Sequence, residues 1–364
     1  MLQHQRTDPP ITDLARRTRI VCTIGPASRD RVRELLDAGM DIARINLSHG
    51  TRRDHEAAAK AVRRAAAQAN RGIGLLVDLP GPKVRLGVFD GDSAQIRAGL
   101  TVSIVRNEGR ATASRLTTSH PGLVDDLRTG DRVLLADGAV ELAVVDPAEA
   151  ADSVTLDVLR GGTVRSRAGV SVPAERLSLP ALTPQDLALL DDLRALDPEL
   201  VGQSFVRAAA DVDVLRDALG SDGPRIVAKI ETRPAVEAIE AILGSADAIM
   251  VARGDLGVEI PYEAVPIVQK RLIAAARAAG RPSIVATQML ESMTHASRPT
   301  RAEASDVANA VLDGADAVML SAETAIGEFP VEATAAAARI IEYAEAAPED
   351  PWPDGGWHIP GPRR

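Results

Sequence analysis

Residues 225–254 read RIVAKIETRPAVEAIEAILGSADAIMVARG, and this stretch contains the repeating unit that decides the fold. A β-branched run, RIVAKIE (225–231), is followed by an amphipathic segment, PAVEAIEAIL (234–243), and then by a second apolar run, AIMVARG (248–254). Strands of a parallel sheet are buried on both faces, so they have this continuous apolar character, and helices connect them. The stretch therefore predicts a β–α–β unit.

The same alternation continues on both sides of this unit. Six further apolar runs precede helical segments: RIVCTIG (19–25), DIARINLS (41–48), IGLLVDLP (73–80), LVGQSF (200–205), SIVATQML (283–290) and AVMLSAE (317–323). Together with the first two runs they make eight strand–helix units, which predict an α/β fold, a closed (β/α)₈ TIM barrel. An open doubly wound sheet usually has a Gly-rich G-x-G-x-x-G turn after its first strand, and the GPAS turn there does not match it.

One long segment interrupts this pattern. Between about Leu86 and Pro173 the helical periodicity stops, and short β-branched runs alternate with Gly, Asp and Ser turns. This pattern predicts a small β-barrel lid domain inserted after the third barrel strand, at the end of the barrel where active sites lie. The expected organisation is barrel (1–85), lid (86–173), barrel (174–346) and an irregular Pro/Gly-rich tail (347–364).

Composition excludes several functional classes. The chain has 42 Lys+Arg against 51 Asp+Glu and few aromatic residues, which argues against a basic or stacking surface for nucleic acid. Charged residues interrupt every apolar run well short of the about 18 residues of a membrane span, and MLQHQRTDPP is no secretion signal. The single cysteine, Cys22, excludes an intramolecular disulfide. We therefore expect a cytoplasmic protein with neither a nucleic-acid nor a membrane partner, in which Cys22 is a core residue.

Polar side chains gather near the C-terminal ends of the predicted strands. Because successive strands are neighbours around a barrel, these side chains are expected to meet at one mouth. They are Arg44, Asn46, Ser48, Asp78, Lys229, Glu231, Arg253, Asp255, Thr287, Ser321 and Glu323. Any one of them could be a solvated strand end, but their joint placement favours an active site.

Lys229 and Glu231 are two residues apart in one strand, so their side chains share a face. With Asp255 after the next strand, Glu231 can form a two-carboxylate oxygen site of the kind that Mg²⁺ uses. A structural ion-pair network inside the barrel is the alternative interpretation. Asp255 belongs to ARGDLG (252–257), a turn that can offer backbone N–H groups to an anion.

Longer motifs resemble the pyruvate kinase family, in that family's order and over about Arg19 to Ile340. They include RIVCTIGPAS, AGMDIARINLSHG, VDLPGPKVRLG, AKIE, IMVARGDLGVEIP, ATQMLESM and MLSAETA. The resemblance implies a (β/α)₈ barrel with a β-rich lid after the third strand. It also implies transfer of the phosphoryl group of phosphoenolpyruvate to ADP, which gives pyruvate and ATP in glycolysis.

The resemblance further implies roles at the phosphoenolpyruvate end of the site. Lys229 would be the cation that stabilises the moving phosphoryl group and the developing enolate. Arg44 would clamp the phosphoryl group, for which a guanidinium is suited. Gly254, Asp255 and Thr287 would hold the phosphoenolpyruvate carboxylate, and Thr287 would lie on the path of proton delivery to the enolate.

By the same resemblance, Glu231 and Asp255 would hold an essential Mg²⁺ or Mn²⁺. Asn46 and Arg85 would contact the nucleotide. The resemblance to a family with oligomeric members leaves a homo-oligomer as an option for this chain.

The chain departs from the family at the monovalent-cation site. Many members hold K⁺ at four positions that are Asn46, Ser48, Asp78 and Leu79 here, and Lys83 stands where those members have glutamate. Because an ammonium group can supply the positive charge of K⁺, we expect activity without K⁺.

Two other departures leave the function open among three hypotheses. Ala168 replaces a family lysine that contacts nucleotide, the adjacent Arg167 is expected to point the other way, and the chain stops where many members continue into an effector-binding domain. The first hypothesis is an active pyruvate kinase. The second is a catalytically weak, phosphoenolpyruvate-binding paralogue with a sensing or partner role, and the third is a nucleotide-independent barrel enzyme that acts on the pyruvate enolate.

Overall fold

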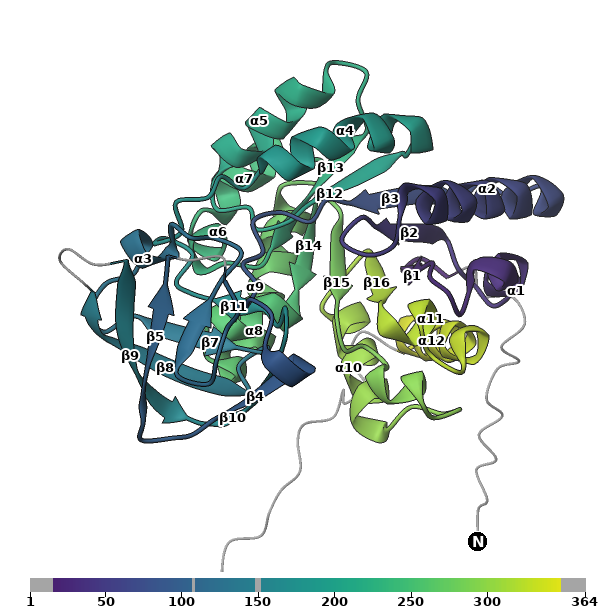
Figure 1. Ribbon diagram of the computed structural model, residues 1–364. Helices are drawn as coiled ribbons and strands as arrows, with labels where there is room; N and C mark the ends of the chain where they lie inside the picture. Colours follow the sequence, from purple (N-terminus) through teal and green to yellow (C-terminus); the bar gives the residue numbers. More distant parts are fainter. Residues whose placement is uncertain (1–15, 107–108, 148–151, 348–364) are drawn as a thin grey trace, which may run out of the picture.

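The computed structural model describes residues 16–106, 109–147 and 152–347, which form a barrel and a smaller β-rich lobe beside it (Figure 1). Eight parallel strands close the barrel in the order β1-β16-β15-β14-β13-β12-β3-β2. They are β1 (Arg19–Thr23), β2 (Ile42–Asn46), β3 (Gly74–Asp78), β12 (Leu200–Gln203), β13 (Arg225–Ile230), β14 (Ala248–Ala252), β15 (Ser283–Ala286) and β16 (Ala317–Leu320). The predicted closed barrel is confirmed, and every strand ends at least one residue before the end of its predicted run.

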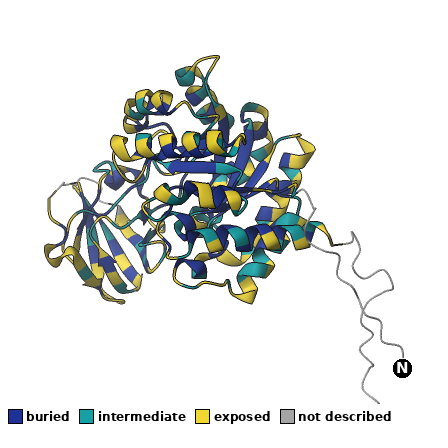
Figure 2. Cartoon of the chain, turned by 90° about the vertical axis from the view of Figure 1, so that its right-hand side faces the viewer, coloured by how far each residue is buried: buried dark blue, intermediate teal, exposed yellow. Residues whose placement is uncertain are grey.

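Alternation along the strands separates two apolar layers. In β13, Val227 faces the barrel interior with residues such as Leu76 and Met250, whereas Ile226 and Ala228 face the surrounding helices. A strand with both faces packed in this way is buried throughout, as the dark strands at the centre of Figure 2 show. Lys229 follows Val227 by two residues, so it belongs to the interior face.

Helices connect the strands and cover the barrel (Figure 1). They are α1 (Val32–Asp37), α2 (Arg52–Ala69), α4 (Pro184–Leu196), α5 (Ala209–Leu219), α6 (Arg233–Glu237), α7 (Ile239–Ser245), α8 (Arg253–Glu259), α9 (Val265–Ala278), α10 (Arg301–Leu312), α11 (Ala322–Ala325) and α12 (Pro330–Glu345). Thr51, Thr183 and Thr300 cap α2, α4 and α10 with reciprocal capping boxes. The segment predicted as one helix over 234–243 is two helices, because Ala238 leaves helical geometry.

The β-rich lobe lies between β3 and α4 in the sequence and has a hydrophobic core of its own. Its sheets have the orders β11-β7-β8-β9-β5-β6 and β10-β4. The strands are β4 (Ser93–Ile96), β5 (Thr101–Val105), β6 (Arg115–Thr117), β7 (Arg132–Leu135), β8 (Val140–Pro147), β9 (Ser153–Arg160), β10 (Gly162–Arg165) and β11 (Val170–Ser171), and the short α-helix α3 (Leu123–Asp126) lies among them. The predicted β-rich insertion after the third barrel strand is therefore confirmed.

The domain boundaries proposed from the sequence stay a prediction, and the predicted tail over 348–364 lies outside the described residues. Cys22 is fully buried in the barrel wall, as expected, and burial raises the pKa of its thiol to about 12. Within the described ranges, no helix combines the length and the apolar character needed to cross a membrane.

Candidate active site

Four interior-facing positions on adjacent strands form one polar layer at the mouth of the barrel. Arg44 on β2, Asp78 on β3, Gly202 on β12 and Lys229 on β13 each follow an apolar interior residue by two positions. Glu231, directly after β13, continues the same face. The strand alternation therefore places two cations and two carboxylates within one small volume.

Asp78 and Glu231 hold the two cations in place. Arg44 Nη2 and Nε lie 2.8 Å and 3.0 Å from Asp78 Oδ2. Lys229 Nζ lies 3.5 Å from the same oxygen and 2.9 Å from Glu231 Oε1. Both carboxylate side chains are 1% exposed, and the cations are only slightly more so. Charges buried to this extent need partners of opposite sign, and here each has at least one.

The pKa shifts of these groups show which charges persist. Burial would raise the pKa of Asp78, but the charges of Arg44 and Lys229 outweigh burial and hold that pKa below its usual range. Burial likewise opposes the ammonium of Lys229, but Glu231 and Asp78 raise its pKa above its usual range. Lys229 therefore stays charged at neutral pH.

Burial is the main influence on the charge of the Glu231 carboxylate. Burial raises the pKa of Glu231, the nearby charge of Asp255 raises it further, and Lys229 only partly offsets these effects. Its second oxygen, Oε2, accepts a hydrogen bond from Phe205 N at 2.7 Å. Two carboxylates that repel each other in this way form an oxygen donor set that a divalent cation would stabilise.

Asp255, the carboxylate that acts on Glu231, forms an ion pair with Lys83. Lys83 Nζ lies 3.1 Å from Asp255 Oδ1, and both side chains are about one-third exposed. Lys83 belongs to the segment between β3 and the β-rich lobe. This pair joins the start of that lobe to α8 across the mouth, and it places Lys83 on the same carboxylate that we assign to the metal.

Among the four positions expected for a monovalent cation, the oxygens of Asn46 and Leu79 have hydrogen-bond partners and one oxygen of Asp78 has none. Asn46 Oδ1 accepts a hydrogen bond from Ser48 N at 3.1 Å, and the carbonyl of Leu79 accepts one from Ser204 Oγ at 2.8 Å. Asp78 Oδ1 is buried and has no hydrogen-bond partner among the described residues. The expectation that Lys83 replaces K⁺ stays a prediction.

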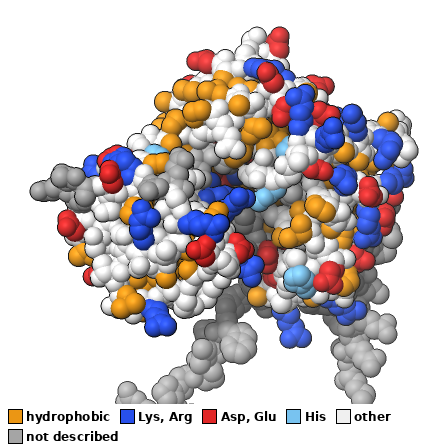
Figure 3. All heavy atoms as spheres, viewed as in Figure 1, with side chains coloured by type: hydrophobic (Ala, Val, Ile, Leu, Met, Phe, Trp, Pro, Cys, Tyr) orange, Lys and Arg blue, Asp and Glu red, His pale blue; other side chains and the backbone are white. Residues whose placement is uncertain are grey.

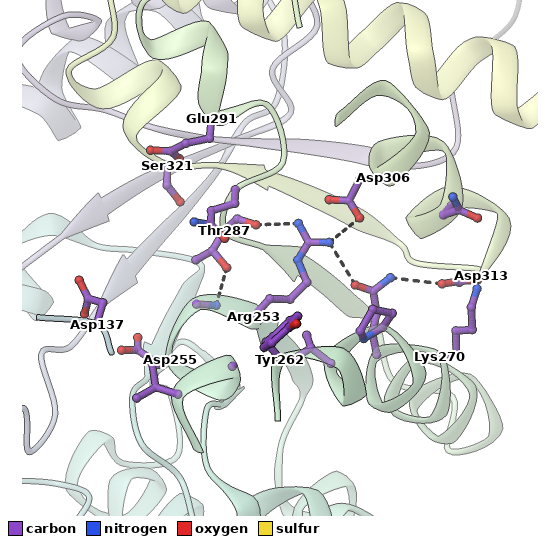
Figure 4. A pocket seen from close by; sticks show the side chains of 18 of the residues that line it. Asp137, Arg253, Asp255, Tyr262, Lys270, Thr287, Glu291, Asp306, Asp313 and Ser321 are labelled. Carbon is purple, nitrogen blue, oxygen red and sulfur yellow. Dashed lines mark hydrogen bonds and ion pairs between the residues drawn. The ribbon is translucent and has the colours of Figure 1, made fainter. Parts of the chain in front are cut away.

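A strained loop follows β15 and faces α8 (Figure 4). Thr287 and Gln288 have φ values of +71° and +54°, a left-handed backbone that a β-branched residue rarely adopts. Thr287 Oγ1 accepts a hydrogen bond from Gly254 N at 2.8 Å and donates one to the Ala286 carbonyl at 2.5 Å. The predicted substrate residues Gly254 and Thr287 are thus in direct contact.

Two cavities open at this mouth. One, of about 870 Å³, is lined by Lys83, Gly254, Asp255 and Thr287 among others. The second, of about 690 Å³, is lined by Arg44, Asn46 and His49 among others, and Ser321 lines both cavities. Figure 3 shows Lys, Arg and His side chains at the hollow between barrel and lobe.

Arg85 lies at the junction of the lobe and the barrel. Its Nη1 donates a hydrogen bond to the Arg167 carbonyl at 3.2 Å. Burial lowers the pKa of His49, and the charges of Arg85, Arg44 and Lys83 lower it further. These cations are therefore within electrostatic reach of His49, which lines the second cavity with Asn46.

Comparison with known proteins decides the family. Residues 15–334 match the family model described as pyruvate kinase, barrel domain. The chain belongs to the pyruvate kinase family. It is 48% identical over 336 residues to the pyruvate kinase of Corynebacterium efficiens, covering 91% of this chain and 70% of the relative. It is 48% identical over 343 residues to a pyruvate kinase of Mycobacterium tuberculosis, covering 92% of this chain and 72% of the relative. The pyruvate kinase of Geobacillus stearothermophilus is 42% identical over 342 residues, with 92% and 58% covered.

Two residues that support this pyruvate kinase site were not singled out from the sequence. Ser204 Oγ accepts a hydrogen bond from Lys229 Nζ at 2.7 Å, and Thr23 Oγ1 accepts one from Arg44 Nη1 at 3.0 Å. Both stand at or just after a strand end, which is the signal that could have identified them.

Glu323 was expected at the mouth of the barrel, but in the structure its carboxylate is buried and accepts hydrogen bonds from backbone N–H groups. It is fully buried, and its carboxylate accepts hydrogen bonds from Leu290 N at 3.0 Å and Ser321 N at 2.7 Å. Glu323 thus satisfies backbone donors of the loops after β15 and β16, and nothing in its contacts connects it to pyruvate kinase chemistry.

Proposed function

We propose that this member of the pyruvate kinase family transfers the phosphoryl group of phosphoenolpyruvate to ADP and releases pyruvate and ATP. The observation that supports this most strongly is the charged layer in which Asp78 and Glu231 hold Lys229 and Arg44. Phosphoryl transfer depends mainly on positioning and on neutralising developing negative charge, rather than on covalent chemistry by the protein. Two buried, counter-charged cations at the mouth supply both.

Lys229 takes the central role in this mechanism. Its ammonium is held in a defined position by Asp78, Glu231 and the Ser204 hydroxyl, and its positive charge favours a phosphoryl group at the mouth of the barrel. It also stabilises the negative charge that develops on the enolate oxygen. Arg44 lines the adjacent cavity with its guanidinium oriented by Asp78 and Thr23, and it binds phosphoryl oxygens from the nucleotide side.

A divalent cation, Mg²⁺ or Mn²⁺, fits the pair Glu231 and Asp255. When bound there, such a cation supplies positive charge that neutralises phosphoryl and substrate oxygens. The raised pKa of Glu231 is the observation that supports this assignment, because burial and Asp255 both disfavour its charge. Within the described residues, no cluster of three or more acidic, His or Cys side chains surrounds a metal position, so a cation held by this pair would need water and substrate oxygens to complete its coordination.

Thr287 and the backbone of Gly254 and Asp255 bind the carboxylate of phosphoenolpyruvate. Gly254 N and the Thr287 hydroxyl line the same cavity and are hydrogen-bonded, at 2.8 Å and 2.5 Å, to Thr287 Oγ1 and to the Ala286 carbonyl, so an entering carboxylate would take these two donors over from their present acceptors. After phosphoryl transfer the enolate must gain a proton at carbon, and Thr287 Oγ1 lies on the path by which a proton can reach it.

Asn46 and Arg85 contact the nucleotide in this proposal. Asn46 and His49 line the 690 Å³ cavity. Burial lowers the pKa of His49 and the charge of Arg85 lowers it further, so Arg85 acts on a residue of this cavity. Ala168 packs against the core of the lobe and supplies no cation, whereas the neighbouring Arg167 is exposed with a φ of +63°. We therefore assign contact with the phosphates of ADP to Arg44, which lines this cavity, and to Arg85.

Pyruvate formation from phosphoenolpyruvate, ADP and Mg²⁺ tests the proposal, with Lys229→Met as the inactivating variant. Lys60→Met is the matched control, because Lys60 is 81% exposed on α2 and far weaker in its pairing. We expect turnover that requires ADP, is lost in Lys229→Met by at least about a hundredfold, and is unchanged in Lys60→Met.

Other outcomes select the other hypotheses. Tight phosphoenolpyruvate binding without turnover would replace the proposal with a sensing paralogue. Pyruvate formation that needs no ADP would identify an enzyme acting on the pyruvate enolate.

A further inference from the structure

The loop after β15 has a backbone conformation that its own residues disfavour. Thr287 and Gln288 are consecutive residues in the left-handed region, which side chains with a Cβ rarely adopt and β-branched residues adopt least. Such a conformation persists only where surrounding contacts impose it. Contacts from outside the loop must therefore impose the left-handed backbone at Thr287 and Gln288.

The guanidinium of Arg253 contacts this loop at three points. Its Nη2 donates to the Thr287 carbonyl at 2.7 Å and lies 2.9 Å from the Met289 sulfur. Its Nε donates to the Ala286 carbonyl at 3.3 Å. Figure 4 shows the guanidinium pointing at the loop from the start of α8. One side chain thus contacts the backbone of Ala286 and Thr287 and the side chain of Met289, which follows the strained pair.

The guanidinium is itself held by two other helices. Nη1 donates to Asp306 Oδ1 on α10 at 2.7 Å and to Gln269 Oε1 on α9 at 3.4 Å. Gln269 in turn donates to Asp313 Oδ2 at 3.2 Å. The Arg253 side chain is only 13% exposed. A planar fork with five donors can make these contacts at once, and a lysine ammonium cannot.

The next residue in the chain, Gly254, closes the arrangement. Its N–H donates to Thr287 Oγ1, so the side chain of Arg253 fixes the Thr287 backbone while the following amide fixes the Thr287 hydroxyl. We propose that Arg253 is a positioning residue for the carboxylate of phosphoenolpyruvate, and that it acts through Thr287. This inference deepens the proposed function and rests on it.

A double-mutant cycle tests the coupling, with Arg253→Lys, Thr287→Ala and the double variant. Arg216→Lys is the matched control, because Arg216 also donates to a carbonyl (Ser245) and to a carboxylate (Asp247) next to the start of a barrel strand. We expect either single change to raise KM for phosphoenolpyruvate about tenfold to a hundredfold, because a hydrogen bond to a charged group is lost. KM for ADP should not change, and the double variant should be no worse than Thr287→Ala.

Two kinetic outcomes overturn the inference. Multiplicative effects in the double variant would show that Arg253 acts independently of Thr287. A parallel rise in both KM values, with a lowered melting temperature, would show a general structural role.

Calorimetric titration of the same variants with phosphoenolpyruvate separates this inference from the proposed function. A wild-type chain that binds phosphoenolpyruvate without forming pyruvate would remove the proposed function. In that case weaker binding by Arg253→Lys would still support the positioning role, and unchanged binding would overturn it. A wild-type chain that binds no phosphoenolpyruvate would overturn both.

Discussion

Gly202 offers a sharp test of the charged layer, because its missing side chain makes room for Asp78. The two residues are paired across β12 and β3. A Cβ at position 202 would lie 2.1 Å from Asp78 Oδ1 and 2.9 Å from its Cγ, distances that no real contact allows. Gly202→Ala must therefore displace the carboxylate that holds Arg44 at 2.8 Å and Lys229 at 3.5 Å.

The size of the effect follows from these contacts. Overpacking a filled interior costs about 1–3 kcal/mol, and breaking a buried ion pair costs about 3–5 kcal/mol. Because Lys229 keeps Glu231 as a partner, we expect the free energy of unfolding to fall by about 2–4 kcal/mol. A catalytic cation misplaced by about 1 Å lowers the rate about a hundredfold, so kcat should fall by that order.

The assay compares Gly202→Ala with Gly244→Ala in urea unfolding and in ADP-dependent pyruvate formation. Gly244 lies in α7 with no atom within 4 Å of its would-be Cβ, so its substitution should leave kcat unchanged and slightly stabilise the helix. Wild-type kcat and wild-type stability in Gly202→Ala would refute the reasoning, because Asp78 would then not be the fixed counter-ion of the two cations.

Three further predictions concern cation, proton and thiol chemistry. Replacing K⁺ by a large inert cation should leave the kcat of the wild-type chain unchanged, because Lys83 brings a positive charge to the mouth, and a K⁺-dependent rate would contradict this. Burial raises the pKa of Glu259 from 4.5 to about 7, so the folded chain binds the proton more tightly than the unfolded chain. The contribution of Glu259 to the free energy of unfolding should therefore fall by up to about 3 kcal/mol as the pH rises from about 5 to 8, and Glu259→Gln should remove that part of the pH dependence. Cys22, buried and with its thiol pKa raised to about 12, should react with a thiol reagent only after unfolding, and rapid labelling of the native chain would contradict its burial.

The barrel could be predicted because its strands are buried on both faces. Such strands read as unbroken apolar runs, and the helices between them carry capping threonines, so element order was available from the sequence. The residues at which the strands end could not be predicted from the sequence. The run 283–290 looked like one strand, but β15 ends at Ala286 because Thr287 and Gln288 are left-handed, and no residue type there indicates it.

The site was predictable to the extent that strand order brings residues together. Two-residue spacing was enough to place Lys229 and Glu231 on one face. It could not show that Lys83, outside any strand, pairs with Asp255. It also could not separate a mouth residue from a structural acceptor such as Glu323, since both are acidic residues after a strand. Those distinctions depend on loop conformation, which long-range packing decides.

The pairing of β1 with β16, which closes the barrel, affects how this chain folds during its synthesis. β1 pairs with β2 and also with β16, and Glu345 accepts hydrogen bonds from the backbone of Arg17 and Thr18. The β1–β16 pairing and the Glu345 contacts join residues about 300 positions apart, so a chain emerging from the ribosome exposes one open edge of β1 until β16 has been synthesised. In the lobe, β7, β8 and β9 pair with their neighbours in sequence, and its most distant paired strands, β4 and β10, are still far closer in sequence than β1 and β16, so the lobe can pair much earlier. We therefore expect translation pauses or chaperones that shield the first strand to affect the yield of active protein more than events in the lobe do.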